Sequence, residues 1–169
     1  YEPLIRRTAG LGKPPREFKS KSIHLHQNVD IVIVGGGLSG LLAAKKLAGT
    51  KYDVLLIERE NTLGGILKNT KKIKLINDQS PSEWLEKTER LIENSHNIKI
   101  LKNTLVTTYN YSNHLIVIED KSVGKPQDDE KPEFVLHKIR TNQTILANGH
   151  IERFISFRNN DLPGVMLAA

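Results

Sequence analysis

Cysteine is absent from this 169-residue sequence. That absence excludes disulfides, thiolate metal sites, iron–sulfur ligation and a redox-active Cys-x-x-Cys motif. No apolar run approaches the roughly 18–20 residues that a membrane-spanning helix needs, and no signal-peptide pattern is present. We therefore expect no membrane partner, and we take the cytoplasm as the default compartment.

Aromatic residues are scarce, with four tyrosines, four phenylalanines and one tryptophan. The net charge of +6 raises the question of nucleic-acid binding, but the basic clusters are not interleaved with the aromatics that single-strand platforms use. No RNA-binding signature occurs either. The clusters are Arg6, Arg7, Lys13, Arg16, Lys19 and Lys21, and Lys68, Lys71, Lys72 and Lys74. We predict no nucleic-acid partner and interpret these residues as solvated loops, with an acidic partner subunit as the alternative.

The length suits one domain with a sizeable hydrophobic core, and 38% hydrophobic and 26% charged residues are typical of a globular protein. Residues 1–28 are expected to form an extended arm, because glycines and prolines interrupt every pattern there. The sequence starts without Met and ends in an apolar stretch. We therefore expect it to be a piece of a larger assembly.

A strand–helix–strand unit is predicted between residues 29 and 58. Residues 29–34 form a short β-branched run, typical of a strand buried on both faces of a parallel sheet. Residues 38–47 carry Leu and Ala on one side, which indicates a helix, and Gly49 is expected to end it. A second buried strand follows at residues 53–57.

The next helix has clear start signals. Ser80 is a suitable N-cap, Pro81 stands at the first helical position, and Glu83 completes a Ser-x-x-Glu capping box. The inward stripe of this helix is expected to be Trp84, Thr88, Leu91 and Ile92.

Strands dominate the remainder of the chain. We expect a third buried strand at 97–101, a hairpin of 105–109 and 115–119, a polar loop at 121–132, and two more strands at 133–140 and 144–147. Strands alternating with helices indicate an α/β fold, and a three-stranded meander before the last parallel strand departs from a plain dehydrogenase domain. The predicted class is a Rossmann-like, three-layer FAD/NAD(P)-binding domain with a parallel sheet and an inserted antiparallel β-meander.

The chemistry is expected at the glycines of residues 35–40, which spell G-x-G-x-x-G. The pattern follows a predicted strand, opens a predicted helix and is trailed by an acid at the end of the next strand. Gly35 would make the tight turn, Gly37 would let the backbone approach a diphosphate, and Gly40 would let the helix pack on the strand. The helix N-terminus offers free N–H groups and partial positive charge, and Ser39 can donate to a phosphate.

Glu58 stands 18 residues after Gly40, where it can accept hydrogen bonds from ribose hydroxyls. Its charge would repel a 2′-phosphate, which disfavours NADP. Gly64 and Gly65 can bring a second stretch of backbone near the phosphates, although a glycine pair in a loop is more often only a turn. Residues 29–169 are therefore predicted to form a dinucleotide-binding domain, incomplete on its C-terminal side.

Three stretches of the chain together resemble a known family. They are residues 1–12, residues 30–58 with Gly64 and Gly65, and residues 145–166, which combine Ala-Asn-Gly with Ile-Glu-Arg and Asn-Asp-Leu-Pro-Gly-Val-Met. The pattern is similar to that of the glutathione-reductase-like flavoproteins. Within them it most resembles the α subunit of heterotetrameric sarcosine oxidase and the dye-linked proline dehydrogenases.

The resemblance implies a subunit that holds FAD, or NAD in the same groove, while a flavin-containing β-type subunit oxidises a secondary amine or imino acid such as sarcosine or proline. Family members differ in placing NAD, FAD or ATP there. The expected cofactor-binding residues are Gly35, Gly37, Leu38, Ser39, Gly40, Glu58, Arg59, Gly64, Gly65, Ile66, Val106, Ala147, Asn148 and Gly149. The expected partners are the β-type subunit and the missing C-terminal part.

The chain also departs from the family's pattern. Asn148, His150 and Phe154 stand where the family has Thr, a small residue and Pro. Asn keeps a polar side chain and tolerates positive φ, so the turn at this position can survive. The family's second nucleotide fingerprint, its later Gly-Asp segment and its C-terminal folate-type domain are not found in these residues, which indicates a split gene or a truncated chain.

No catalytic acid or base and no metal site is expected. The six histidines give no third ligand at useful spacing, and His150, close to the expected nucleotide site, is interpreted as a loop residue. Ser39 lacks the Gly-x-Ser-x-Gly surroundings of a nucleophile elbow. The chemistry is expected to belong to the cofactor or to a partner.

Three functions stay open on the sequence. The first is a dinucleotide-binding subunit, or subunit fragment, of an amine- or imino-acid-oxidising flavoenzyme complex, inactive on its own. The second is a self-contained pyridine-nucleotide oxidoreductase, against which the absence of cysteine and of a second fingerprint argues. The third is a non-catalytic scaffold in which bound nucleotide only stabilises an assembly. The sequence disfavours the second function and does not separate the first from the third.

Overall fold

Strands and helices alternate through the first half of the chain, and strands alone make up the second half. The computed structural model describes residues 8, 22–68, 75–76, 78–123, 133–150 and 156–164. In chain order the elements are β1 (Ser22–Val34), α2 (Leu38–Leu47), β2 (Val54–Ile57), the 3-10 turn η1 (Gly65–Lys68), α3 (Pro81–Glu93), β3 (Ile98–Leu101), β4 (Thr104–Asn110), the 3-10 turn η2 (Tyr111–Asn113), β5 (His114–Asp120) and β6 (Phe134–Leu146).

Two long strands, β1 and β6, form the centre of the sheet. Each has 13 residues, and they pair in parallel from Ser22 beside Phe134 to Val34 beside Leu146. Beyond β1 the strands β2 and β3 are parallel, and beyond β6 the strands β5 and β4 are antiparallel, so the order is β3-β2-β1-β6-β5-β4. The predicted α/β class, with a parallel sheet and an antiparallel meander, is confirmed.

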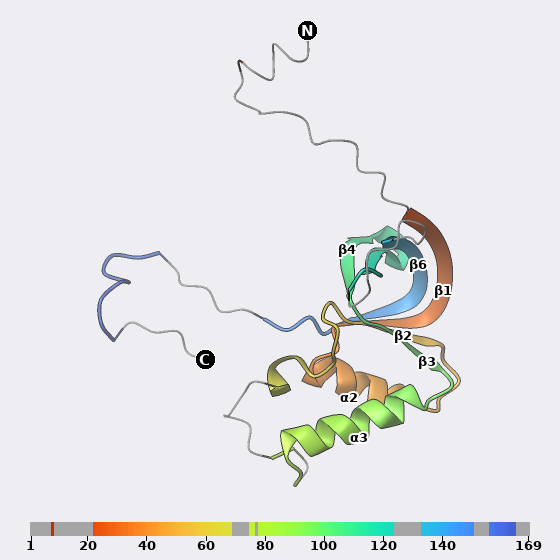
Figure 1. Ribbon diagram of the computed structural model, residues 1–169, viewed down its shortest axis with the longest axis horizontal. Coiled ribbons are helices and arrows are strands. Elements are labelled where there is room, and N and C mark those ends of the chain that lie inside the picture. Colours follow the sequence, from red (N-terminus) through yellow and green to blue (C-terminus); the bar gives the residue numbers. More distant parts are fainter. Residues whose placement is uncertain are drawn as a thin grey trace.

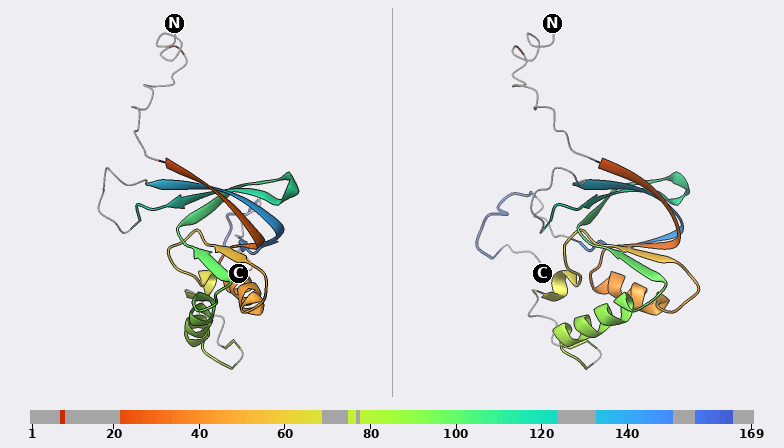
Figure 2. Two further views of the ribbon diagram at one scale, coloured as in Figure 1. Left: turned by 90° about the vertical axis from the view of Figure 1, so that its right-hand side faces the viewer. Right: turned by 45° about the vertical axis from the view of Figure 1, so that its right-hand side comes forward.

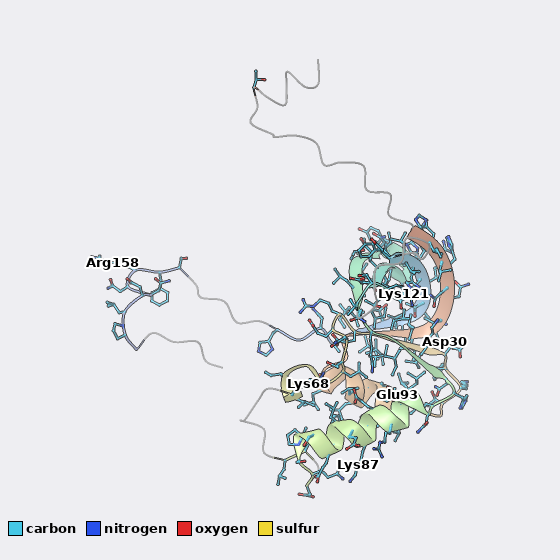
Figure 3. All side chains as sticks on the ribbon, viewed as in Figure 1. Asp30, Lys68, Lys87, Glu93, Lys121 and Arg158 are labelled. Atoms are coloured by element: carbon cyan, nitrogen blue, oxygen red, sulfur yellow. The ribbon has the colours of Figure 1, made fainter. Side chains whose placement is uncertain are left out.

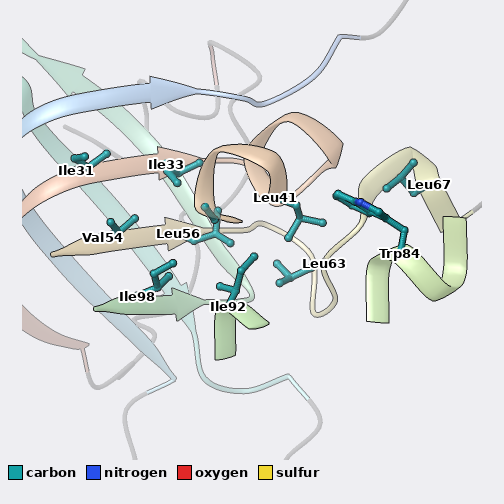
Figure 4. Close-up of a cluster of buried hydrophobic side chains, with 11 residues drawn as sticks. Ile31, Ile33, Leu41, Val54, Leu56, Leu63, Leu67, Trp84, Ile92 and Ile98 are labelled. Atoms are coloured by element: carbon teal, nitrogen blue, oxygen red, sulfur yellow. The ribbon is translucent and has the colours of Figure 1, made fainter. Parts of the chain in front are cut away.

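The parallel strands are covered on both faces, so the fold has three layers. All four residues of β2 are buried. One face packs on the helices, with Ile33 and Leu56 of the sheet against Leu41 of α2 and Trp84 of α3 in one cluster (Figure 4). The other face packs against the meander. That second cluster consists of Val32, Leu55, Ile57, Leu101, Leu115, Val117 and Ile139. Figure 1 and the turned views of Figure 2 show the helices and the meander on opposite sides of the parallel strands.

The ends of both helices follow local sequence signals. The Ser80 hydroxyl accepts the Glu83 N–H at 3.3 Å, and the Glu83 carboxylate accepts the Ser80 N–H at 3.2 Å, which confirms the capping box. The hydrogen bond from the Ser80 N–H lowers the pKa of Glu83. Gly49 ends α2 with φ +72°, and its N–H donates to the buried Asn97 side chain at 2.9 Å. The predicted bounds of α2 and the predicted start of α3 therefore hold.

Two strand predictions are wrong. Residues 22–28, assigned to the arm, form the first half of β1, because they pair with residues 134–140 of β6. Apart from Thr8, the rest of the predicted arm lies outside the described residues. The strands predicted at 133–140 and 144–147 are one strand, since the residues between them continue the pairing with β1.

One predicted core residue of α3 is also wrong. Leu91 is 41% exposed, whereas Trp84, Thr88 and Ile92, spaced four apart, are buried. A spacing of four keeps these three on one side of the helix, and Leu91 falls at the edge of that stripe. In the described part of the chain, no helix combines the length and apolarity needed to cross a membrane.

Candidate dinucleotide-binding site

The turn between β1 and α2 brings backbone so close together that two of its glycines admit no side chain. Gly35 has φ +103°, and a Cβ on it would lie 2.4 Å from the carbonyl oxygen of Ala147. A Cβ on Gly40 would lie 1.8 Å from the carbonyl oxygen of Gly35. Real Cβ atoms do not approach a backbone oxygen so closely. Gly35 therefore permits the turn and Gly40 the close packing of helix on strand, which is the geometry that the motif predicts.

Gly37 differs from Gly35 and Gly40, because no atom of the described residues crowds it. It is the N-cap of α2, with φ −76° and ψ −171°, and a Cβ built on it meets no heavy atom within 4 Å among the described residues. No side chain caps this helix end, so the first-turn N–H groups, those of Leu38 and Ser39 included, have no acceptor within the helix. The open side of Gly37 thus adjoins a helix N-terminus that favours a diphosphate.

Glu58 follows β2, and its carboxylate reaches back to the glycine turn. Its Oε2 accepts the Gly36 N–H at 2.6 Å, and its Oε1 accepts the Glu60 N–H at 2.8 Å. Each carboxylate oxygen keeps a second lone pair, so the carboxylate is fixed in place and can still accept ribose hydroxyls. The Arg59 side chain is 71% exposed and pairs with the Glu60 carboxylate at 3.1 Å.

The glycine pair after Glu58 lies against the glycine turn. Gly64 donates its N–H to the Gly36 carbonyl at 2.8 Å, and a Cβ on Gly65 would come within 3.2 Å of the Gly37 Cα. Both have positive φ, +109° and +52°. A second stretch of backbone therefore flanks Gly37, as the sequence predicts. Ile66, the next residue, is 69% exposed.

The segment after β6 completes the surroundings of the turn. Ala147 donates its N–H to the Val34 carbonyl at 2.8 Å, which sets the ends of β1 and β6 side by side. Asn148 and Gly149 follow and are exposed, with Gly149 at φ +71°. Val106 lies on β4 and packs against the core between meander and parallel strands. Its contact with a nucleotide, like the other assignments of ligand contacts, stays a prediction.

Two hollows on the described surface lie away from the glycine turn. One adjoins the outer edge of β3 and is lined by residues such as Lys99, Asn103 and Asp120. The other lies at the opposite end of the parallel strands, beside Asp30 and Asp53. Asp30 accepts the Asp53 N–H at 3.0 Å there, which ties the second half of β1 to the residue before β2.

Gly36 was not among the predicted site residues, although its N–H positions Glu58. A Cβ on it would lie 2.5 Å from the Leu63 Cδ2 and 3.0 Å from the Glu58 Oε2. The signal available in the sequence is the run of three glycines, of which the motif uses two. The third is a glycine where the side chains of Leu63 and Glu58 pack against the turn.

A buried polar cluster within the meander also escaped prediction. Glu119 accepts from His137 Nε2 at 2.9 Å and from Lys121 Nζ at 2.5 Å, and Gln27 Nε2 donates to His137 Nδ1 at 2.5 Å. Burial raises the pKa of Glu119, but the hydrogen bonds from Lys121 and His137 outweigh it and lower the pKa below its usual value. The cluster joins β1, β5 and β6.

This fold and this turn define a Rossmann-like domain of the FAD- and NAD(P)-binding oxidoreductase fold. Residues 33–82 match the family described as NAD(P)-binding Rossmann-like domain. These residues span the end of β1, the glycine turn, Glu58 and the glycine pair. The comparison supports a dinucleotide ligand, FAD or NAD(P), without distinguishing between them.

The relatives confirm the resemblance to sarcosine oxidase α subunits. The chain is 32% identical over 148 residues to sarcosine oxidase subunit alpha of Corynebacterium sp. (strain P-1), which is 86% of this chain and 15% of the relative. It is 30% identical over 172 residues to the same subunit of Rhizobium meliloti (strain 1021), which is 99% of this chain and 17% of the relative. The chain thus spans about one-sixth of the length of these curated relatives.

Two solved structures are also similar to this chain. The L-proline dehydrogenase of P. horikoshii has a TM-score of 0.55 and 27% sequence identity, over 86% of this chain and 27% of that one. A thioredoxin reductase of Lactococcus lactis has a TM-score of 0.53 at 21% identity, over 79% of this chain and 39% of that one, and is similar in fold alone.

Proposed function

We propose that the chain is the dinucleotide-binding part of a flavin-dependent oxidoreductase complex that oxidises a secondary amine or imino acid. The observation that carries the proposal is the open Gly37 at the uncapped start of α2. Gly35 and Gly40 are glycines because the protein backbone crowds them, whereas the protein itself gives no steric reason for a glycine at position 37. A ligand that presses against this backbone supplies one.

The choice of FAD rests on the relatives. Sarcosine oxidase subunit alpha and L-proline dehydrogenase each align with 86% or more of this chain, and the two names describe oxidation of sarcosine and of proline. NAD in the same groove is the alternative, since both dinucleotides share the adenosine diphosphate half. The Glu58 carboxylate disfavours a 2′-phosphate in either case, because two negative charges would meet there.

The residues of the turn fit an adenosine diphosphate. The N–H groups at the start of α2 would bind the diphosphate, and Glu58, oriented by Gly36 and Glu60, would bind the ribose hydroxyls. A bound flavin would supply the electron acceptor for substrate oxidation. We assign no proton-transfer role to this turn, so substrate oxidation would also need residues of another polypeptide or of a longer chain.

The nucleotide content of the purified protein tests this proposal. We expect a flavin absorption spectrum, with FAD identified by chromatography after acid release, and a measurable affinity for added FAD. Retention of NAD alone would support the alternative ligand. Failure to bind FAD, NAD and ADP would contradict the proposed function and leave a Rossmann-like scaffold.

A further inference from the structure

The outer face of the meander is unusually apolar for a sheet face that has no covering layer in the described part of the chain. Its inner face is accounted for, since Leu115, Val117 and Ile139 pack in the core. Because side chains alternate along a strand, the residues between them point to the other face. An antiparallel sheet with one solvated face normally carries polar side chains there. In β5 the outward residues include Ile116 and Ile118.

The strand register shows that the outward apolar residues are neighbours. Directly paired residues share a face, and the pairs place Leu136 of β6, Ile118 of β5 and Leu105 of β4 side by side across the meander. Ile116 and Phe134 lie diagonally next to this row. Leu105 is 49% and Phe134 39% exposed, and the other three are half-buried. We call these five residues the apolar centre of the meander face.

Positive charge borders the apolar centre on one side. The register sets Lys138 beside Ile116, and Arg140 beside His114, on this same face. The β1 residues His24 and His26 extend the border next to Leu136 and Lys138. Among the described residues of β4, β5 and β6 on this face, Asp120 is the only carboxylate. We call Lys138, Arg140 and the three histidines the basic rim.

This charge pattern selects among possible occupants. A second copy of the chain would bring a basic rim of its own, and like charges in contact oppose binding. Residues 1–21 are also basic, with Arg6, Arg7, Lys13, Arg16, Lys19 and Lys21. A polypeptide with an apolar centre and a carboxylate border is complementary on both counts.

We propose that the meander face is a docking surface for another subunit, one that presents apolar side chains flanked by carboxylates. The inference rests on the proposed function for the choice of that subunit, which is the flavin-carrying subunit of the same complex. The face lies on the first halves of β1 and β6, and the glycine turn follows the far end of β1. Docking therefore leaves the dinucleotide site accessible, and the two can be tested separately.

The experiment measures binding of the separately purified flavin-carrying subunit to the chain by calorimetry, at low and at moderate salt. We expect K138E/R140E and, separately, Leu105→Glu each to weaken binding about tenfold or more, as truncations of central interface residues do. K138E/R140E should also flatten the salt dependence, because rim charges act through long-range attraction. Lys87→Glu, on the exposed side of α3 (Figure 3), is the matched control and should bind as the wild type does.

Three outcomes would contradict the proposed docking surface. Equal binding by wild type and both face variants would place the interface elsewhere, and so would failure of the wild type to bind that subunit. Self-association of the wild type that Leu105→Glu abolishes would make the face a contact between copies. Nucleotide binding, measured on the same samples, reports on the proposed function independently: a wild type that binds none of FAD, NAD and ADP contradicts that function, whether or not the subunit docks.

Discussion

Replacing Gly37 with Val should abolish nucleotide binding without unfolding the protein. The backbone at Gly37 has φ −76°, an ordinary value for Val, and a Cβ there meets no heavy atom of the described residues within 4 Å. We therefore expect the free energy of unfolding to change by no more than about 0.5 kcal/mol, as for other surface substitutions. The new side chain would instead occupy the space next to the first turn of α2.

The loss of affinity follows from the hydrogen bonds that a displaced diphosphate gives up. If two bonds from backbone N–H groups to the charged phosphates are lost, at about 1.5–3 kcal/mol each, binding weakens by about 3–6 kcal/mol. At about 1.4 kcal/mol per factor of ten, the dissociation constant rises on the order of a hundredfold to ten-thousandfold. Titration of FAD followed by flavin fluorescence would measure this change.

Gly40→Ala is the matched comparison, because it also adds a side chain to a glycine of the motif but should lower the stability of the fold. Its Cβ would lie 1.8 Å from the Gly35 carbonyl oxygen, which is backbone and cannot rotate away. Moving α2 off the strand should cost about 1–3 kcal/mol or more, which exceeds the roughly 1 kcal/mol that Ala gains over Gly within a helix. Thermal unfolding should show a lowered midpoint for Gly40→Ala and an unchanged midpoint for Gly37→Val. A Gly37→Val protein that binds FAD as tightly as the wild type would refute the reasoning.

Three further outcomes are expected. Glu58→Ala should weaken FAD binding about tenfold to a hundredfold, since each ribose hydrogen bond to a carboxylate contributes at most about 1.5–3 kcal/mol; wild-type protein with equal affinity for NAD and NADP would argue against this role. Glu119→Gln should destabilise the fold by about 1–3 kcal/mol near neutral pH, because it weakens the contacts with His137 and Lys121. The folded-state pKa of Glu119 is lowered, so its contribution to stability is complete above the unfolded pKa of about 4.3 and is lost as pH falls through the folded pKa. The difference in melting midpoint between the wild type and Glu119→Gln should therefore shrink below about pH 4. A difference that persists at lower pH would contradict this role of Glu119. The isolated chain should not reduce a dye acceptor with sarcosine or proline as donor, and robust turnover would move the active site into these residues.

The strand–helix–strand unit and its glycine turn were predictable because their causes are local. Gly40 is set by the Gly35 carbonyl of the same turn, and the capping box at Ser80 lies within one helical turn, whereas the crowding at Gly35 comes from the distant Ala147. The β-branched run at 29–34 and the apolar run at 53–57 match strands that are buried on both faces. In the capping box and in these two strands, the residues that form the sequence pattern are also the residues that make the contacts.

The extension of β1 could not be predicted from local pattern. Residues 22–28 alternate His24 and His26 with Ile23, Leu25 and Gln27, and pairing with residues more than a hundred positions later makes them a strand. Gln27 is part of that explanation, since it faces inward and meets the buried His137. The alternation of Ile23 and Leu25 with His24 and His26 is short, and only the long-range pairing with β6 makes this segment part of β1.

The link between Glu58 and Gly36 is likewise a product of the tertiary fold. The sequence predicts an acid at the end of β2 and glycines after β1, and the parallel register sets Val34 beside Ile57. That register brings the Glu58 carboxylate to within 2.6 Å of the Gly36 nitrogen. The sequence therefore predicts the members of the site, and the fold determines that the acid orients the turn before any nucleotide binds.

The most direct test of the dinucleotide site is an amide NMR titration of the isotope-labelled chain with ADP, the half that FAD and NAD share. The site described predicts the largest shifts at the amides of Gly36, Gly37, Leu38 and Ser39, with Glu60 and Gly65 following. Shifts confined to the hollow beside β3 or to that beside Asp30, or no saturable shifts at all, would contradict the site.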